Sequence, residues 1–161
     1  MDSVIAVLPL RIDGYGIGSE VYYRSKICKD ERSCELFLKH FCEKRGISVR
    51  LMRKRIKDNL KISRNIPYFV DSLNVFFPFK FRETKEKNLR RGFVNATYVI
   101  DIKDSRIFLK NGSCLDSLSS DSALWSNFNH ARQLVYMALA RDFSRLNKQK
   151  DFIDKLDIFD F

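Results

Sequence analysis

The sequence predicts an α+β fold in which two amphipathic helices, at about 34–45 and 123–146, cover one face of a largely antiparallel sheet. Runs rich in Val, Ile, Phe and Tyr, separated by turn residues, are typical of antiparallel strands. Two other segments repeat apolar residues at helical spacing. With 161 residues and 45% hydrophobic content, the chain suits a single domain at 1–147, followed by an amphipathic, acidic C-terminal tail at 148–161.

The N-terminal part is predicted to hold a β-hairpin and a helix. Residues 4–12 and 20–28 have strand-like patterns and are separated by a glycine-rich turn. Ser33 is a suitable N-cap for the helix at 34–45, and Gly46 is a suitable residue to end it.

Strands are predicted for the middle of the chain. Ile47, Val49 and Leu51 alternate with Ser48, Arg50 and Met52, which indicates a strand. Residues 53–64 lose this alternation and are predicted to form the end of the strand and an exposed loop. Pro67 and Pro78 flank two strongly apolar runs. Because proline cannot donate a ladder hydrogen bond, these runs are expected at strand starts or sheet edges. A mobile loop is predicted at 83–92.

The last part of the chain is predicted to form a meander and then the second helix. Residues 93–102, 106–110 and 113–118 are rich in strand-forming residues, and Asn111-Gly112 is a strong signal for a type I′ turn. These three runs are therefore expected to pair as consecutive antiparallel strands.

The net charge of +10 arises in two short segments, which we call the first and second basic stretch. Residues 50–64 hold seven cations against Asp58, and residues 80–91 hold six cations against two glutamates. They carry +6 and +4, so the rest of the chain is balanced. The cations are Arg50, Arg53, Lys54, Arg55, Lys57, Lys61 and Arg64 in the first stretch, and Lys80, Arg82, Lys85, Lys87, Arg90 and Arg91 in the second.

This concentration of positive charge predicts a polyanionic partner, most simply nucleic acid. Charge runs often only face solvent, but seven cations against one anion leave repulsion that a bound polyanion would relieve. The nearby Tyr68, Phe79, Phe81 and Phe93 could stack on bases or wedge into a groove, although most are expected in the core. No helix-turn-helix recognition helix is predicted, because both stretches show strand-like or loop-like patterns.

No catalytic, cofactor or metal site is predicted, and the chain is not expected to be an enzyme. The glycine-rich segment 14–18 lacks the Lys-Ser/Thr of a phosphate-binding loop, so a hairpin turn is favoured. Cys28, Cys34, His40 and Cys42 contain no C-x-x-C pair, which favours packing over zinc binding.

The expected location is the cytoplasm, without membrane contact. The apolar run near the N-terminus is interrupted by Pro9 and lacks the basic residues and the length of a signal peptide. No segment approaches the length of a membrane span, and the four cysteines are therefore expected to be reduced.

Seven groups of residues follow one another along the chain in a familiar order: Ile5-Ala6-Val7-Leu8-Pro9, Ile12-Asp13-Gly14, Arg32-Ser33-Cys34, Lys44-Arg45-Gly46, Ile66-Pro67 with Val70-Asp71-Ser72, Val75-Phe76-Phe77-Pro78, and Asn111-Gly112. In this order they resemble the bacterial competence transcription factor family ComK, over about residues 4–140. The resemblance implies a cytoplasmic activator of DNA-uptake genes in low-GC Gram-positive bacteria. Such an activator reads A/T-rich boxes through the minor groove and binds as a homodimer or as paired dimers, with RNA polymerase as a further partner.

The chain departs from the family pattern at two positions. Phe79-Lys80-Phe81 stands where a Thr-x-Ser is expected, and Arg91-Gly92-Phe93 stands where a Cys-x-Trp is expected. The tail at 148–161 has no clear counterpart and is a candidate site for a regulatory protein. The resemblance is therefore that of a divergent member.

All thirteen cations of the two basic stretches are predicted to contact double-stranded DNA. Arg53, Arg55, Arg90 and Arg91 are expected to enter narrow, A/T-rich minor grooves. The lysines expected to bind phosphates are Lys54, Lys57, Lys61, Lys85 and Lys87. Two alternatives stay open. An RNA-binding module would prefer single strands or loops, and an adaptor would bind an acidic protein or an anionic membrane.

Overall fold

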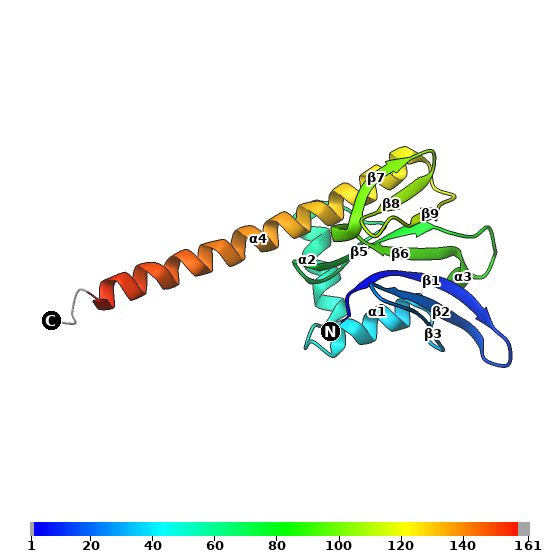
Figure 1. Ribbon diagram of the computed structural model, residues 1–161, viewed down its shortest axis with the longest axis horizontal. Coiled ribbons are helices and arrows are strands. Elements are labelled where there is room, and N and C mark those ends of the chain that lie inside the picture. The colour runs from blue at the N-terminus through cyan, green and yellow to red at the C-terminus, as the bar shows by residue number, and fades with distance from the viewer. Residues whose placement is uncertain (1, 158–161) are drawn as a thin grey trace.

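Two antiparallel sheets form the body of the protein in the computed structural model, which describes the backbone of residues 2–157 and the side chains of residues 2–151 (Figure 1). The strands are β1 Val4–Ile12, β2 Gly16–Tyr23, β3 Ile27–Asp30, β4 Tyr68–Asp71, β5 Asn74–Lys80, β6 Arg91–Asn95, β7 Val99–Lys103, β8 Arg106–Leu109 and β9 Cys114–Asp116. The larger sheet has the order β3-β2-β1-β6-β5-β4, and the smaller has the order β7-β8-β9. The predicted α+β class and antiparallel sheet are confirmed.

The helices are α1 Cys34–Glu43, α2 Val49–Leu60, α3 Lys87–Arg90 and α4 Asp121–Asp157, with a 3-10 turn η1 at Ala96–Tyr98. The two predicted helices correspond to α1 and α4, but they pack on opposite faces of the larger sheet. Neighbouring residues of a strand point to opposite faces. In β5 the centroid of the Phe76 ring lies 5.9 Å from that of Phe41 in α1, and the centroid of Phe77 lies 5.8 Å from that of Phe128 in α4.

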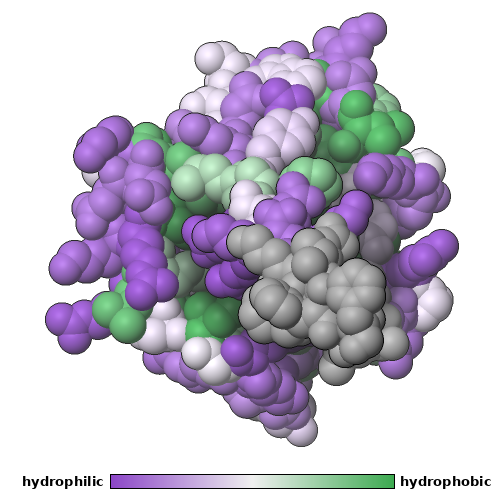
Figure 2. Space-filling model, turned by 90° about the vertical axis from the view of Figure 1, so that its left-hand side faces the viewer, coloured by the Kyte–Doolittle hydropathy of each residue, from purple (hydrophilic) through white to green (hydrophobic). Residues whose placement is uncertain are grey.

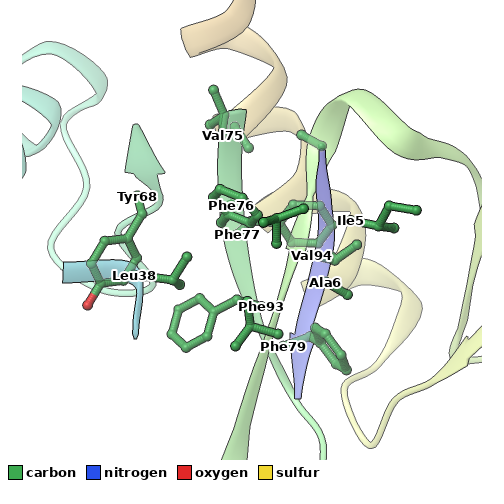
Figure 3. Packing of buried hydrophobic residues seen from close by; sticks show 14 of the residues in the cluster. Ile5, Ala6, Leu38, Tyr68, Val75, Phe76, Phe77, Phe79, Phe93 and Val94 are labelled. Atoms are coloured by element: carbon green, nitrogen blue, oxygen red, sulfur yellow. The ribbon is translucent and has the colours of Figure 1, made fainter. Parts of the chain in front are cut away.

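Apolar side chains from both faces of the central strands form the core (Figure 3). Leu38, Tyr68 and Phe93 point toward one another on one side of β5 and β6, and Ile5 and Val94 lie on the other side. The rings of Tyr68 and Phe93 meet edge to face with centroids 5.5 Å apart, a favourable arrangement for two aromatic side chains. The central strands are thus held from both sides.

Residues 47–52, predicted to be a strand, lead into and begin helix α2. Ser48 caps this helix, because its Oγ accepts a hydrogen bond at 3.4 Å from a backbone N–H of the first turn. Met52 and Ile56, four residues apart, are buried on one face. Arg, Lys, Leu and Met also form helices readily, so the cap and this spacing outweigh an alternation of only a few residues. The loop predicted after this strand is mostly helix as well.

The N-terminal hairpin is present, with Ile12 of β1 opposite Gly16 of β2. The prediction of its second strand at 20–28 is wrong, because β2 begins within the glycine-rich segment, and 20–28 contains the end of β2, a turn and the start of β3. Pro67 directly precedes the edge strand β4, as expected. Pro78 lies within the inner strand β5, but β4 pairs with β5 only as far as Phe76. Pro78 therefore has a neighbouring strand on one side only, which is where a sheet tolerates proline.

The predicted meander is confirmed as β7-β8-β9, but its first run, 93–102, is divided between the two sheets. The chain leaves β6 of the larger sheet at Asn95 and passes through η1 into β7. The predicted type I′ turn is misplaced. Asp104 and Ser105 both have positive φ, 52° and 56°, whereas at Asn111-Gly112 only Gly112 does.

Helix α4 is longer than the predicted 123–146 and runs to Asp157 without a break. Its first turns bury Leu124, Phe128, Ala131 and Leu134 against the body. Beyond them the helix projects away from both sheets (Figure 1), so the predicted boundary between domain and tail falls inside it. Among the described helices, none combines the length and the apolar character of a membrane span.

Candidate nucleic-acid interface

Helix α2 and the turn that follows it expose most of the first basic stretch. The helix buries Met52 and Ile56, and the remaining faces carry the charges. The exposed cations are Arg50, Lys54, Arg55, Lys57, Lys61 and Arg64. We refer to these six side chains as the α2 surface.

The α2 surface is not neutralised by the described part of the protein. None of its six cations forms an ion pair with a described carboxylate, because the ion pairs of residues 2–151 all involve other side chains. Arg53 differs, because it is half-buried. Burial raises the pKa of the Tyr68 hydroxyl to about 12, and the nearby positive charge of Arg53 partly opposes this shift. Arg53 is thus held against the body, while the six others face solvent.

A short connection joins helices α1 and α2, which contact each other. The chain leaves α1 through Gly46, whose φ of 71° lies in the left-handed region that favours glycine. Ile47 N then donates to Cys42 O at 3.1 Å, and Ser48 caps α2. The prediction that the first basic stretch is strand-like and then loop-like is wrong, because most of this stretch lies on helix α2.

The second basic stretch lies in the connection between β5 and β6 and is partly neutralised. Lys80 Nζ lies 2.8 Å from Glu83 Oε2, and Arg11 Nη2 lies 2.6 Å from Glu86 Oε1. Both glutamates of this stretch are therefore paired, one of them with a cation from β1. Ion pairs as exposed as these contribute little to stability, but they lower the charge available to a ligand.

Arg90 has a structural role in the same connection. Its Nε and Nη2 donate to Thr84 O at 3.1 and 3.0 Å, which closes the loop that leads into α3. The guanidinium of Arg82 lies over the Phe81 ring at 5.6 Å from its centroid. The cations that remain exposed here are Lys85, Lys87 and Arg91.

The two basic stretches lie at opposite ends of the central strands. Helix α2 contacts β4, where Phe69 N donates to the sulfur of Met52 at 3.2 Å, and β4 pairs with the first half of β5. The second stretch begins at the other end of β5, where Lys80 lies opposite Arg91 of the neighbouring strand β6. Figure 1 shows α2 and α3 on different sides of the sheet region. The predicted site therefore divides into two separate surfaces.

The aromatic residues suggested for base stacking are mostly part of the core. Tyr68, Phe79 and Phe93 are 4%, 2% and 2% exposed, and Phe81 is half-buried. The exposed aromatic side chains of the described residues, Tyr15, Tyr136 and Phe143, lie outside both basic stretches. The basic surfaces thus offer charge without a stacking platform.

One cation near the α2 surface was missed from the sequence. A groove of about 480 Å³ between α2 and α4 is lined by Arg55 from α2 and Arg141 from α4, together with Leu51 and Met137. Figure 2 views the side from which α4 projects, where hydrophobic patches alternate with hydrophilic side chains. Arg141 belongs to the charge-balanced part of the sequence, so local charge counting gives no sign that it lies near Arg55.

A second groove, of about 460 Å³, lies beside α1. Its lining includes the cations Lys26, Arg32 and Lys44 and the acids Asp2 and Asp30. Arg32 donates from Nε and Nη2 to the two carboxylate oxygens of Asp30 at 2.9 and 2.8 Å. These hydrogen bonds lower the pKa of Asp30. Because this acid offsets a cation within the groove, the groove is a weaker anion site than the α2 surface.

The buried thiols are suited to packing. Cys34 Sγ donates to Val7 O at 3.6 Å, and burial raises the pKa of Cys34 to about 12 and that of Cys42 to about 11. Both thiols are thus protonated near neutral pH. Among the side chains of residues 2–151, no three His, Cys, Asp or Glu residues converge as a metal site.

A scan against protein-family models and searches of curated proteins and of solved structures found no match to this chain.

Proposed function

We propose that the protein binds duplex DNA and that the α2 surface is its main contact. Six exposed cations that lack described ion pairs are the observation that supports this proposal. Phosphates would supply the missing negative charge, and the release of counterions from DNA would drive the association. The protein would then act as a DNA-binding regulator without catalysis of its own, as its resemblance to the ComK family implies. The competence genes and the A/T-rich boxes stay predictions.

A duplex suits this surface better than single-stranded RNA does. Binding of single strands depends on aromatic side chains on which bases stack. Helix α2 contains no aromatic residue, and Tyr68 and Phe93 are buried. The charged helix instead matches the regular phosphate array of a double helix.

The major groove is the more suitable location for α2. An α-helix with its side chains is about 10–12 Å across, and the major groove of B-DNA is about 12 Å wide. The expectation of minor-groove reading relied partly on the absence of a basic helix. We therefore propose that α2 lies along the major groove, and we assign any minor-groove contact to the second basic stretch, where Arg91 is exposed.

The salt dependence of DNA binding tests the proposal. If all six cations of the α2 surface meet phosphates, log affinity should fall against log salt with a slope of about −5, because each contact contributes about −0.9. Lys54→Ala with Lys57→Ala should make the slope shallower by about 2. The measurement is a fluorescence anisotropy titration of a labelled duplex at several salt concentrations.

A matched control removes the same charge elsewhere. Lys103 and Lys110 are exposed on the smaller sheet and its turn, and Lys103→Ala with Lys110→Ala should leave the slope unchanged. An equal loss of slope in both double variants would mean that net charge alone drives binding, and a slope near zero in the unaltered protein would exclude DNA binding. Tighter binding to single-stranded RNA than to a duplex at the same salt would favour the RNA alternative.

The groove is tested by replacing A·T pairs of a bound site with inosine·cytosine pairs, which keep the minor-groove pattern of A·T and change the major groove. We expect weaker binding, because the hydrogen-bonding groups that face α2 in the major groove change. Unchanged binding would instead support recognition of the bases through the minor groove. The affinity of a duplex with scrambled sequence serves as the baseline for contacts to phosphates alone.

A further inference from the structure

The groove between α2 and α4 has walls from three elements. Helix α2 and its cap line it with residues between 48 and 59, and α4 lines it with residues between 134 and 141. The edge strand β4 contacts both helices and contributes Phe69 and Val70. The groove is thus a concave site with one helix on either side and the edge of the larger sheet between them.

Apolar side chains make up most of the lining and are partly open to solvent. Leu51 of α2 and Met137 of α4 are 54% and 37% exposed, while Met52, Ile56 and Leu134 are buried. Covering exposed apolar surface with hydrocarbon is favourable, because it removes that surface from water. Methionine side chains are flexible and adapt to ligands of irregular shape. The lining therefore offers a binding surface to an apolar chain.

The charged groups of the groove all have the same sign. Arg55 and Arg141 are the charged side chains among its lining residues, and no described carboxylate lines it. Neither arginine forms an ion pair with a carboxylate of residues 2–151. The groove beside α1 differs, because Asp2 and Asp30 also line it. Two exposed guanidiniums at one apolar groove call for an anionic group, and a carboxylate can accept hydrogen bonds from both.

The dimensions of the groove favour a single hydrocarbon chain over a partner helix. Its lining follows α2 from residue 48 to residue 59, which is about 17 Å of helix. A partner helix of that length, about 10–12 Å across, would have a volume of about 1,300 Å³ or more. The groove holds about 480 Å³, a volume typical of sites for small ligands. It is therefore long and narrow, as an extended chain requires.

We infer that the groove between α2 and α4 binds the anion of a long-chain carboxylic acid, with its hydrocarbon chain on Leu51 and Met137 and its carboxylate at Arg55 and Arg141. Arg55 also belongs to the α2 surface. The site is therefore tested without DNA, and the inference does not depend on DNA binding.

Calorimetry with matched amphiphiles tests the chemistry of the ligand. Isothermal titration of the full chain with dodecanoate, below the concentration at which it forms micelles, should show one site per chain. Dodecyltrimethylammonium has the same chain with a cationic head group and should bind at least about tenfold more weakly, because it meets two guanidiniums. Butyrate keeps the carboxylate and should also bind at least about tenfold more weakly, because it buries little apolar surface.

A pair of arginine variants tests the place of the carboxylate. Arg141→Gln should raise the dissociation constant of dodecanoate by at least about tenfold, because a charged hydrogen-bond donor is lost. Arg132→Gln removes the same charge nine residues earlier on α4, which is the opposite face of the helix, and should change the constant by less than about twofold. Both arginines are exposed, so the thermal midpoint should stay nearly the same in both variants.

The methionines report on the place of the chain. Of the three methionines in the sequence, Met52 and Met137 line the groove. In protein labelled with carbon-13 at the methionine methyl groups, dodecanoate should shift the NMR signals of these two, and Met137→Leu identifies one of them by its loss.

The inference fails if dodecanoate binds no more tightly than dodecyltrimethylammonium, if the two arginine variants weaken binding equally, or if the signals of Met52 and Met137 do not move. Binding of an acidic amphipathic peptide or of anionic phospholipid vesicles, without binding of dodecanoate, would assign the groove to a partner helix or to a membrane surface and would also overturn the inference.

Discussion

Asn95 shows how one buried polar side chain joins separate parts of the chain. It is 0% exposed, and its Nδ2 donates to Val4 O at 3.1 Å and to Leu73 O at 3.0 Å. Its Oδ1 accepts a hydrogen bond from Thr97 N at 3.2 Å. The asparagine therefore connects β1, the β4–β5 turn and η1 at the point where the chain leaves the larger sheet.

Asn95→Leu should destabilise the fold by about 3 kcal/mol, because the buried Val4 carbonyl and the part-buried Thr97 N–H lose their hydrogen bonds to Asn95. Denaturant unfolding followed by circular dichroism measures the change in the free energy of unfolding. Asn59→Leu, at an exposed position of α2, should change it by less than about 0.5 kcal/mol. Equal effects of the two substitutions would show that the hydrogen bonds of Asn95 do not stabilise the fold.

Because of the two buried thiols, the free energy of unfolding should depend on pH in the alkaline range. Burial raises the pKa of Cys34 from 9.0 to about 12 and that of Cys42 from 9.0 to about 11. Because the folded-state values lie above the unfolded ones, the stabilisation is fully present below about pH 9 and is lost as the pH rises through the folded values. The free energy of unfolding should therefore fall between pH 9 and 11.

A double variant, Cys34→Ala with Cys42→Ala, should show a shallower fall over this range in urea unfolding at a series of pH values. Cys114→Ala removes an exposed thiol and should leave the slope as it is. Parallel curves for all three proteins would contradict the assignment.

At the scale of single elements, local patterns predicted most strands well and misread α2. The strands β1, β4 and β5 lie where their apolar runs and turn residues indicated. In 47–52 the same kind of pattern misled, because an alternation of three apolar residues fits a helix nearly as well as a strand. The cap at Ser48 and the spacing of Met52 and Ile56 were visible in the sequence and could have decided the question.

The misplaced type I′ turn shows what local patterns omit. Asp121, the first residue of α4, accepts hydrogen bonds from Asp104 N at 3.1 Å and from Ser105 N at 2.6 Å. A carboxylate from a distant helix thus stabilises a turn whose two central residues have positive φ, 52° and 56°. Nothing in the sequence near the turn indicates this contact.

Asp121→Ala should lower the free energy of unfolding by about 2 kcal/mol, because two charge-assisted hydrogen bonds to backbone N–H groups are lost. Thermal unfolding measures the change. Ser122→Ala, at the exposed neighbouring position, should have an effect below about 0.5 kcal/mol. Should Asp121→Asn recover most of the loss, hydrogen-bond geometry rather than charge would hold the turn.

For the whole molecule, the sequence located the excess charge correctly but not its arrangement. Both basic stretches contain exposed cations, as predicted, yet they lie at opposite ends of β5, and Arg90 is engaged in closing a loop. Likewise the spacing on α1 and α4 predicted two helices, but only the packing of Phe76 and Phe77 shows that these lie on opposite faces. Such relations arise from tertiary contacts, which local spacing does not contain.

The length of α4 has a consequence for the reach of the molecule. From residue 136 to residue 157 the helix extends about 33 Å away from the body. This length is close to the roughly 34 Å of one turn of B-DNA. A group bound at the far end of α4 would therefore lie about one helical turn of DNA away from the groove between α2 and α4.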